Sequence, residues 1–107
     1  MTEVTWPMNE TLLQVFKNKH RPRIVAYLIE KHQGTHVSDV SKKLGISKGS
    51  TFVNLSELEA AGVLVHRWAL KKKEKTRMAV KIYSLNPKLP RSIKDTIKRL
   101  VTDGKPT

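Results

Sequence analysis

Hydrophobic residues recur with a helical period in the first third of the chain and again near its end. Apolar positions three and four residues apart predict helices at residues 9–17, from Pro22 to Gly34, and at residues 91–102. Pro22 suits the first turn of its helix, and Gly34 is expected directly after the last turn. The apolar positions of these three helices are Leu12, Leu13, Phe16, Ile24, Val25, Leu28, Ile29, Ile93, Ile97, Leu100 and Val101.

The middle of the chain predicts two further helices joined by a tight turn. The apolar positions of residues 37–44 have helical spacing, and Gly45 is a natural left-handed stop. Ser47 then caps a second helix that runs to Ala61, where Gly62 ends it. The N-cap of the first helix remains open among Thr35, His36 and Ser38.

Residues 63–73 and 76–85 have the character of strands, because β-branched and aromatic residues are interleaved with charges. The polar turn KEKT between them predicts a hairpin, and residues 35–37 are also β-prone. The expected order is α-α-α-α-β-β-α, a mainly α (α+β) fold. Two helices joined by a glycine turn and followed by a basic hairpin, or wing, are the layout of a winged helix-turn-helix. With 107 residues, 38% of them hydrophobic, we expect a single domain at 1–107.

Charge is abundant and unevenly placed. The chain has 21 Lys and Arg against 9 Asp and Glu, a formal net charge of +12, which is typical of proteins with a polyanionic partner. Residues 64–81 hold seven cations and one glutamate, whereas the cations and acids of residues 32–63 cancel. Residues 17–31 and 88–100 each hold five cations and one acid. Basic segments therefore flank a neutral centre.

Several function classes lack their sequence signals. Cysteine is absent, which excludes a disulfide or a thiolate metal site. No apolar run approaches the ~18 residues of a membrane span, and residues 1–10 lack the pattern of a signal peptide. No nucleophile–base pair, glycine-rich phosphate loop or carboxylate dyad occurs. No histidine has a second ligand at metal-binding spacing among His20, His32, His36 and His66. We expect no enzyme, metal, cofactor or membrane association, and a cytoplasmic, DNA-associated protein.

The segment VSDVSKKLGISKGSTFVNLSELEAAGVLV, residues 37–65, resembles the helix-turn-helix of ArsR- and MarR-type winged-helix regulators. The positions that carry the resemblance are Val40, Leu44, Gly45, Ile46, Ser47, Leu55, Leu58, Gly62 and Val63. It extends to KIYSL at residues 81–85, so that the matching core covers about residues 20–86. The resemblance implies a DNA-binding regulator and a homodimer built by terminal helices. The Cys-x-Cys pair of metal-sensing relatives is missing from VSDVSKKL.

The second helix of this pair has a small, uncharged outer face. At about 100° per residue, the sector that must face the core contains Thr51, Leu55, Leu58 and Gly62. The opposite sector contains Gly49, Val53, Ser56 and Ala60. A helix that enters the major groove needs such a face, because bulky charges would hold its backbone away from the base edges. We expect DNA contacts from Ser47, Lys48, Gly49, Ser50, Phe52, Val53 and Asn54. The alternative packs Phe52 under the hairpin and has Asn54 cap a local turn.

The hairpin supplies most of the cations expected to hold phosphate. Five cations in residues 71–77 repel one another unless an anion is near. We expect phosphate or minor-groove contacts from Arg67, Lys71, Lys72, Lys73, Lys75 and Arg77. Near the start of the second helix of the chain, Arg21 and Arg23 either touch flanking phosphate or are solvated. Trp68 is expected to pack rather than to stack on bases.

The terminal helices either pack on the core or build a two-fold dimer. The residues expected in the dimer are Leu12, Leu13, Phe16, Ile93, Ile97, Leu100 and Val101. The expected function is sequence-specific binding of double-stranded DNA by a homodimeric transcription regulator that represses by occlusion. Two alternatives stay open. One is a sequence-neutral architectural DNA-binding protein, and the other is a winged-helix module that contacts protein in a larger assembly through Phe52 and Val53.

Overall fold

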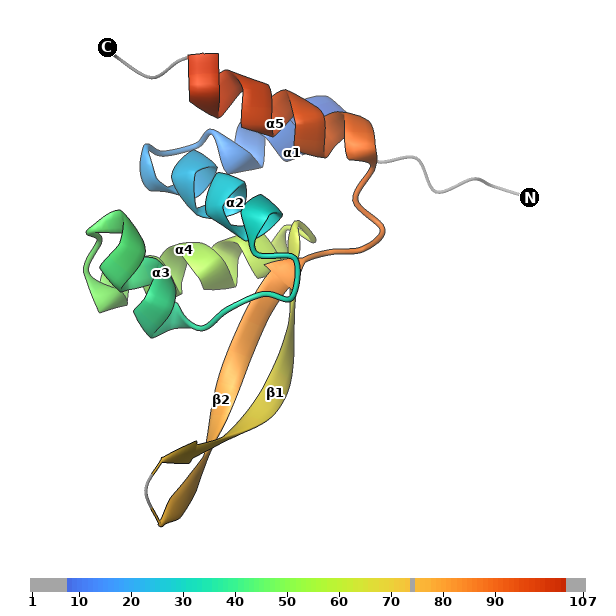
Figure 1. The fold of residues 1–107 in the computed structure, drawn as a ribbon. Coiled ribbons are helices and arrows are strands. Elements are labelled where there is room, and N and C mark those ends of the chain that lie inside the picture. Colours follow the sequence, from blue (N-terminus) through green and yellow to red (C-terminus); the bar gives the residue numbers. More distant parts are fainter. Residues whose placement is uncertain (1–7, 74, 104–107) are drawn as a thin grey trace.

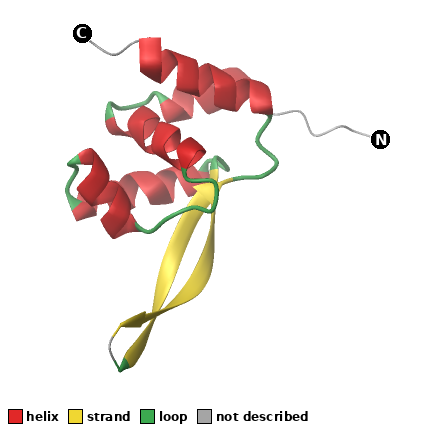
Figure 2. Cartoon of the chain, in the orientation of Figure 1, coloured by secondary structure: helices red, strands yellow, loops and turns green. Residues whose placement is uncertain are grey.

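The structure is a computed structural model that describes residues 8–73 and 75–103. Its elements in chain order are α1 (Met8–Val15), α2 (His20–Glu30), α3 (Val37–Leu44), α4 (Lys48–Ala60), β1 (Leu64–Lys73), β2 (Thr76–Leu85) and α5 (Arg91–Asp103). The order and class predicted from the sequence are confirmed. The five helices form the body, and the two strands form a hairpin that extends away from it (Figures 1 and 2).

Helix α2 is the centre of the body. It packs against α1, α3, α4, α5 and β2, with α1 and α5 on one side and the α3–α4 pair on the other (Figure 1). The apolar stripe predicted for α2 provides this contact, because Ile24, Val25 and Leu28 are buried. Burying each of these side chains contributes about 1.5–3 kcal/mol.

Helix α5 belongs to the same core. Ile93 and Ile97 are fully buried, so the prediction that they form dimer contacts is wrong: they dock α5 on its own chain. Val101 is partly buried against this core, whereas Leu100 is exposed. The remaining core residues outside α2 and α5 are Val15, Val40, Ile46, Leu55, Leu58, Val63, Leu64, Tyr83 and Leu89.

The ends of α2 differ from the prediction. The helix begins at His20, because the Asn18 side chain accepts hydrogen bonds from the N–H groups of His20 (2.9 Å) and the next residue. It ends at Glu30, four residues before Gly34. Gly34 has φ of 82° and lies where the loop passes β2: a Cβ atom there would stand 2.5 Å from the carbonyl oxygen of Tyr83. Its place is set by this close approach.

The hairpin is a two-stranded antiparallel sheet whose register runs from Leu64 opposite Leu85 to Lys73 opposite Thr76. Thr35 adds an isolated bridge to Tyr83, the β-prone segment seen in the sequence. The base of the hairpin is buried through Leu64 and Tyr83, and its outer half is exposed. Within residues 8–73 and 75–103, every helix is too short or too polar to cross a bilayer.

Candidate nucleic-acid interface

The turn between α3 and α4 is fixed by local chemistry. Gly45 adopts the left-handed conformation with φ of 67°, as its sequence position predicted, and its N–H donates to the carbonyl of Ser41. Arg23 of α2 donates from Nη2 to the carbonyl of Leu44 at 2.9 Å. The N-cap of α3, which the sequence left open, is His36: its Nδ1 accepts a hydrogen bond from the N–H of Asp39 at 3.2 Å. Arg23 is exposed and lies at this turn, so its predicted phosphate contact stays a prediction.

The start of α4 is capped as predicted. Ser47 Oγ accepts from the N–H of Ser50 at 3.2 Å, and Thr51 Oγ1 donates to the carbonyl of Ser47 at 2.8 Å. Lys48 and Gly49 in this first turn are exposed, and a Cβ atom added at Gly49 would meet nothing within 4 Å. A helix N-terminus of this kind is open to an anion.

The outer face of α4 is exposed at Phe52 and Val53. Phe52 and Val53 are 50% and 52% exposed. Thr51, Leu55 and Leu58 are fully buried, so the predicted core sector is confirmed. The alternative in which Phe52 packs under the hairpin is wrong, because half of its surface meets solvent. Ser47, Lys48, Gly49, Phe52 and Val53 are exposed and Ser50 is half-buried, so together they form one weakly charged surface with Lys48 as its only cation.

Asn54 departs from its predicted place. Its side chain is buried and faces α2 and the loop before it. Asn54 Oδ1 accepts from Asn18 Nδ2 at 2.8 Å and from Arg21 Nε at 3.2 Å, while Nδ2 donates to the Ser50 carbonyl at 2.9 Å. With these hydrogen bonds made inside the chain, we correct the prediction and leave Asn54 out of the candidate interface.

The predicted phosphate contact of Arg21 is also corrected. The sequence placed it at the surface, but it is only 2% exposed. Besides the bond to Asn54, it donates from Nη1 to the Gln14 carbonyl at 2.9 Å and pairs through Nη2 with Glu57. Arg21 thus joins the end of α1 to α4. Its guanidinium is buried and bonded to α4 and to the end of α1, so it is not available to phosphate.

Cations cover the outer half of the wing. Lys71, Lys72, Lys75 and Arg77 are exposed, as predicted. Arg67 is also exposed and donates from Nη2 to the carbonyl of Gln33 at 3.2 Å, near the base of the hairpin. The side chain of Lys73 lies outside the described part of the structure.

The expectation that Trp68 packs is wrong. Trp68 is 64% exposed, and its ring meets His66 edge-on with 6.1 Å between centroids. Hairpins normally bury one face, but the body reaches only the base of this one.

Two carboxylates link neighbouring elements: Glu59 links α4 to the wing, and Asp39 links α3 to α2. Glu59, near the end of α4, pairs with His66 of β1 and lies 3.8 Å from Lys81 of β2. The carboxylate of Asp39 accepts from the Tyr27 hydroxyl at 2.7 Å and from Thr35 at 2.8 Å. The bond from Tyr27 lowers the pKa of Asp39, and the same bond raises the pKa of Tyr27 to about 12.

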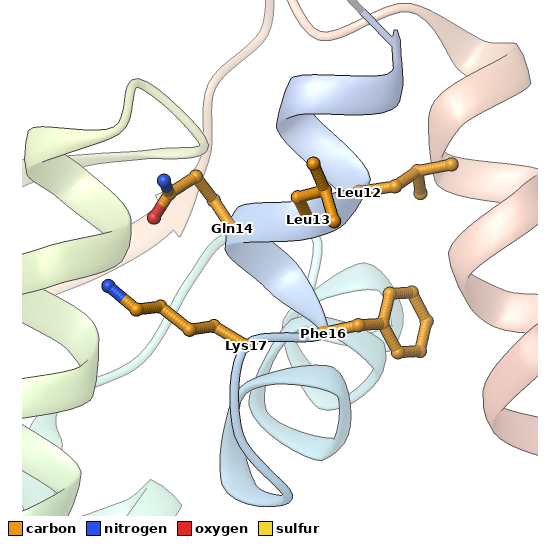
Figure 3. A pocket seen from close by; sticks show the side chains of 5 residues that line it. All are labelled: Leu12, Leu13, Gln14, Phe16 and Lys17. Atoms are coloured by element: carbon orange, nitrogen blue, oxygen red, sulfur yellow. The ribbon is translucent and has the colours of Figure 1, made fainter.

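An apolar hollow lies on α1. Figure 3 shows its lining residues, Leu12, Leu13, Gln14, Phe16 and Lys17. Leu12 and Phe16 point toward α5, and Gln14 and Lys17 point to the opposite side (Figure 3). Leu13 and Phe16 are exposed, whereas Leu12 is partly buried against the core. Three of the predicted dimer residues, Leu13, Phe16 and Leu100, are thus available on the surface.

The described residues hold no group of three or more His, Cys, Asp or Glu side chains arranged to bind a metal ion.

The helical pair, its glycine turn and the hairpin define a winged helix-turn-helix. A solved structure supports this: the chain matches a domain from Mycobacterium bovis with a TM-score of 0.54 and 19% identity, covering 100% of this chain and 94% of that one. That protein is described as the homodimeric winged helix-turn-helix DNA-binding domain of a possible ArsR-family transcriptional regulator. The likeness shows the fold. No family model matches the sequence, and a search of curated proteins gives no match.

Proposed function

We propose that this protein binds double-stranded DNA, with α4 in the major groove and the wing on the phosphate backbone. The observation that carries the proposal is the pairing of an exposed face on α4, built around Phe52 and Val53, with a wing of exposed cations. The solved domain that shares this fold is described as DNA-binding, which supports the same reading.

The two elements divide the work of recognition. Phosphate contacts supply affinity and orientation but carry no sequence information, whereas contacts to base edges specify the site. Lys71, Lys72, Lys75 and Arg77 provide the first kind of contact. On α4, Gly49 lets the backbone approach the DNA, Ser50 offers a hydroxyl, and Val53 and Phe52 offer apolar surface to thymine methyl groups.

We further propose that the protein is a homodimer formed through α1 and α5. Leu13, Phe16 and Leu100 are exposed apolar residues on these helices, and the solved domain from Mycobacterium bovis is described as homodimeric. A two-fold dimer would present two α4 helices to half-sites about 34–36 Å apart.

The dimer is tested by sedimentation. The double variant Leu13→Glu/Phe16→Glu places charge in the apolar contact, so it should sediment as a monomer while the wild-type chain sediments as a dimer. Lys19→Glu, an exposed change in the α1–α2 loop, is the control and should remain dimeric. A wild-type chain that stays monomeric at all concentrations would refute the dimer.

The proposed biological role is a transcription regulator that represses by occluding its site. Selection of preferred duplexes from a random pool tests the specificity. A regulator should bind the selected site at least ~10³-fold more tightly than random duplex at about 150 mM salt. Equal affinity for both would point to the sequence-neutral architectural alternative, and no DNA binding at all would favour the protein-interaction module.

A further inference from the structure

The wing exposes more apolar surface than phosphate binding needs. Trp68 and Leu70 are 64% and 72% exposed. They are two residues apart on β1, so they stand on the same face of the hairpin. Neighbouring large apolar residues in solvent usually mark an interaction site.

Cations lie beside this apolar pair and beyond it toward the tip. Cross-strand partners share a face, and here Lys81 lies opposite Trp68 while the small Ala79 lies opposite Leu70. The next pair on the same face toward the tip is Lys72 and Arg77. From Trp68 to Lys72 the strand spans about 13 Å. From base to tip, this face therefore carries Trp68 beside Lys81, then Leu70 beside Ala79, and then the two cations Lys72 and Arg77.

Charge decides which partner fits this face. A second wing would bring a like-charged surface against it, because residues 64–81 hold seven cations and one glutamate. A polyanion with flat apolar groups between its charges matches the order of side chains. A strand of nucleic acid with unpaired bases has that composition, whereas in a closed duplex the bases present only their edges.

We propose that the Trp68–Leu70 face of the wing binds unpaired bases of a nucleic-acid strand, in a single strand or a locally opened duplex. Trp68 stacks on a base, Leu70 covers its neighbour, and Lys72 and Arg77 hold the phosphate on the side of the tip. The inference rests on the proposed function in taking nucleic acid as the partner, but it uses a different surface from α4 and a different form of the ligand.

Fluorescence of Trp68 gives a direct readout. The chain has two tryptophans, so Trp6→Phe leaves Trp68 as the only one. Because stacked bases rise about 3.4 Å each, a thymine strand of about ten nucleotides covers the whole face. This strand should quench Trp68, whereas a strand of equal length made of abasic deoxyribose phosphate should not. Quenching of equal size by both strands would overturn the proposal.

Affinity provides the second readout. Trp68→Ala should weaken binding of the thymine strand about tenfold, and Trp68→Phe should retain most of it. Binding of the abasic strand should be unchanged by either substitution. Val65→Ala, on the same strand but the opposite face, is the matched control and should bind as the wild type. Equal affinity of Trp68→Ala and wild type for the thymine strand would refute the role of Trp68.

Two further arms separate this proposal from others. The variant Phe52→Ala/Val53→Ala should lose preference for a selected duplex site yet keep the quenching of Trp68 by the thymine strand. Failure of the duplex proposal therefore leaves this result intact. Vesicles of anionic phospholipid test a membrane partner. A blue shift of Trp68 emission with vesicles, together with no quenching by the thymine strand, would replace nucleic acid by a lipid surface.

Discussion

Arg21 and Arg23 stand two residues apart in α2, and the fold uses them in different ways. Arg21 is buried and hydrogen-bonded to Asn54 and Gln14, whereas Arg23 is exposed and holds the carbonyl of Leu44. The sequence contained a signal for this difference. Arg21 precedes Ile24, Val25 and Leu28 by three, four and seven residues, so the helical period places it on the buried stripe of α2. Charge alone suggested a surface position.

The pair gives a matched test of stability. Arg21→Ala removes one of the two donors to Asn54 Oδ1, and also the donor to the Gln14 carbonyl and the partner of Glu57. It should lower the free energy of unfolding by about 2–4 kcal/mol, a value that allows for the exposure of Glu57. Arg23→Ala should cost less than about 1 kcal/mol. Urea denaturation measures both. Similar losses in the two variants would contradict the structural role of Arg21.

Asp39 gives a pH-dependent test. Its pKa lies below the ordinary value of 3.8, chiefly because the Tyr27 hydroxyl donates to the charged carboxylate. A lowered folded-state pKa means that this stabilisation is fully present above the unfolded pKa and is lost as pH falls through the folded value. Tyr27→Phe removes the donor and keeps the ring, so it should cost about 1–2 kcal/mol at pH 7.

The difference between wild type and Tyr27→Phe should shrink as pH falls below about 4. Urea denaturation of both proteins between pH 7 and pH 3 measures this difference. A gap that is the same at both ends of this range would show that the bond to Asp39 is not its source.

At the scale of elements, the sequence predicted each helix and strand of the described residues, and their order. The glycine turn, the Ser47 cap and the core sector of α4 were predictable because each depends on residues close in sequence. The early end of α2 was not predictable, because the position of Gly34 is set by its close approach to Tyr83, which is distant in the chain. For the same reason the contacts among Asn18, Arg21 and Asn54 were missed.

The candidate site was predicted less completely than the fold. The sequence identified the outer face of α4 and the wing cations, since both follow from helical period and local charge. It could not show that Trp68 is exposed, because that depends on how little of the hairpin the body covers. Glu59 was also missed: its partners, His66 and Lys81, lie on separate strands.

Two glycines test α4 and the loop before α3. Gly49→Ala has free space for the added methyl group and should stabilise the fold by about 0.5 kcal/mol while weakening duplex binding, because the methyl stands between the backbone and phosphate. Gly34→Ala should destabilise by about 2 kcal/mol or more, since φ is positive and the Cβ atom would clash with Tyr83. Thermal denaturation and duplex titration together check both. A Gly49→Ala protein that binds duplex as tightly as wild type would contradict the close approach of this turn.

At the scale of the whole molecule, the body positions two surfaces of different chemistry. The network around Arg21 ties α4 to α1 and α2, and Glu59 ties the end of α4 to both strands of the wing. Helix α4 and the wing are therefore both fixed to the body, and the proposed dimer helices α1 and α5 lie on the far side of the body (Figure 1). A duplex held by the wing would meet α4 in a fixed orientation.

The most direct test measures duplex affinity against salt concentration for two variants that carry no new charge. Lys71→Ala/Lys72→Ala should reduce the slope of log affinity against log salt by up to about two and leave the preference for the selected site unchanged. Phe52→Ala/Val53→Ala should keep the slope and lower the preference at least tenfold. A wing variant with the wild-type slope, or an α4 variant with the wild-type preference, would contradict the division of work between the two surfaces.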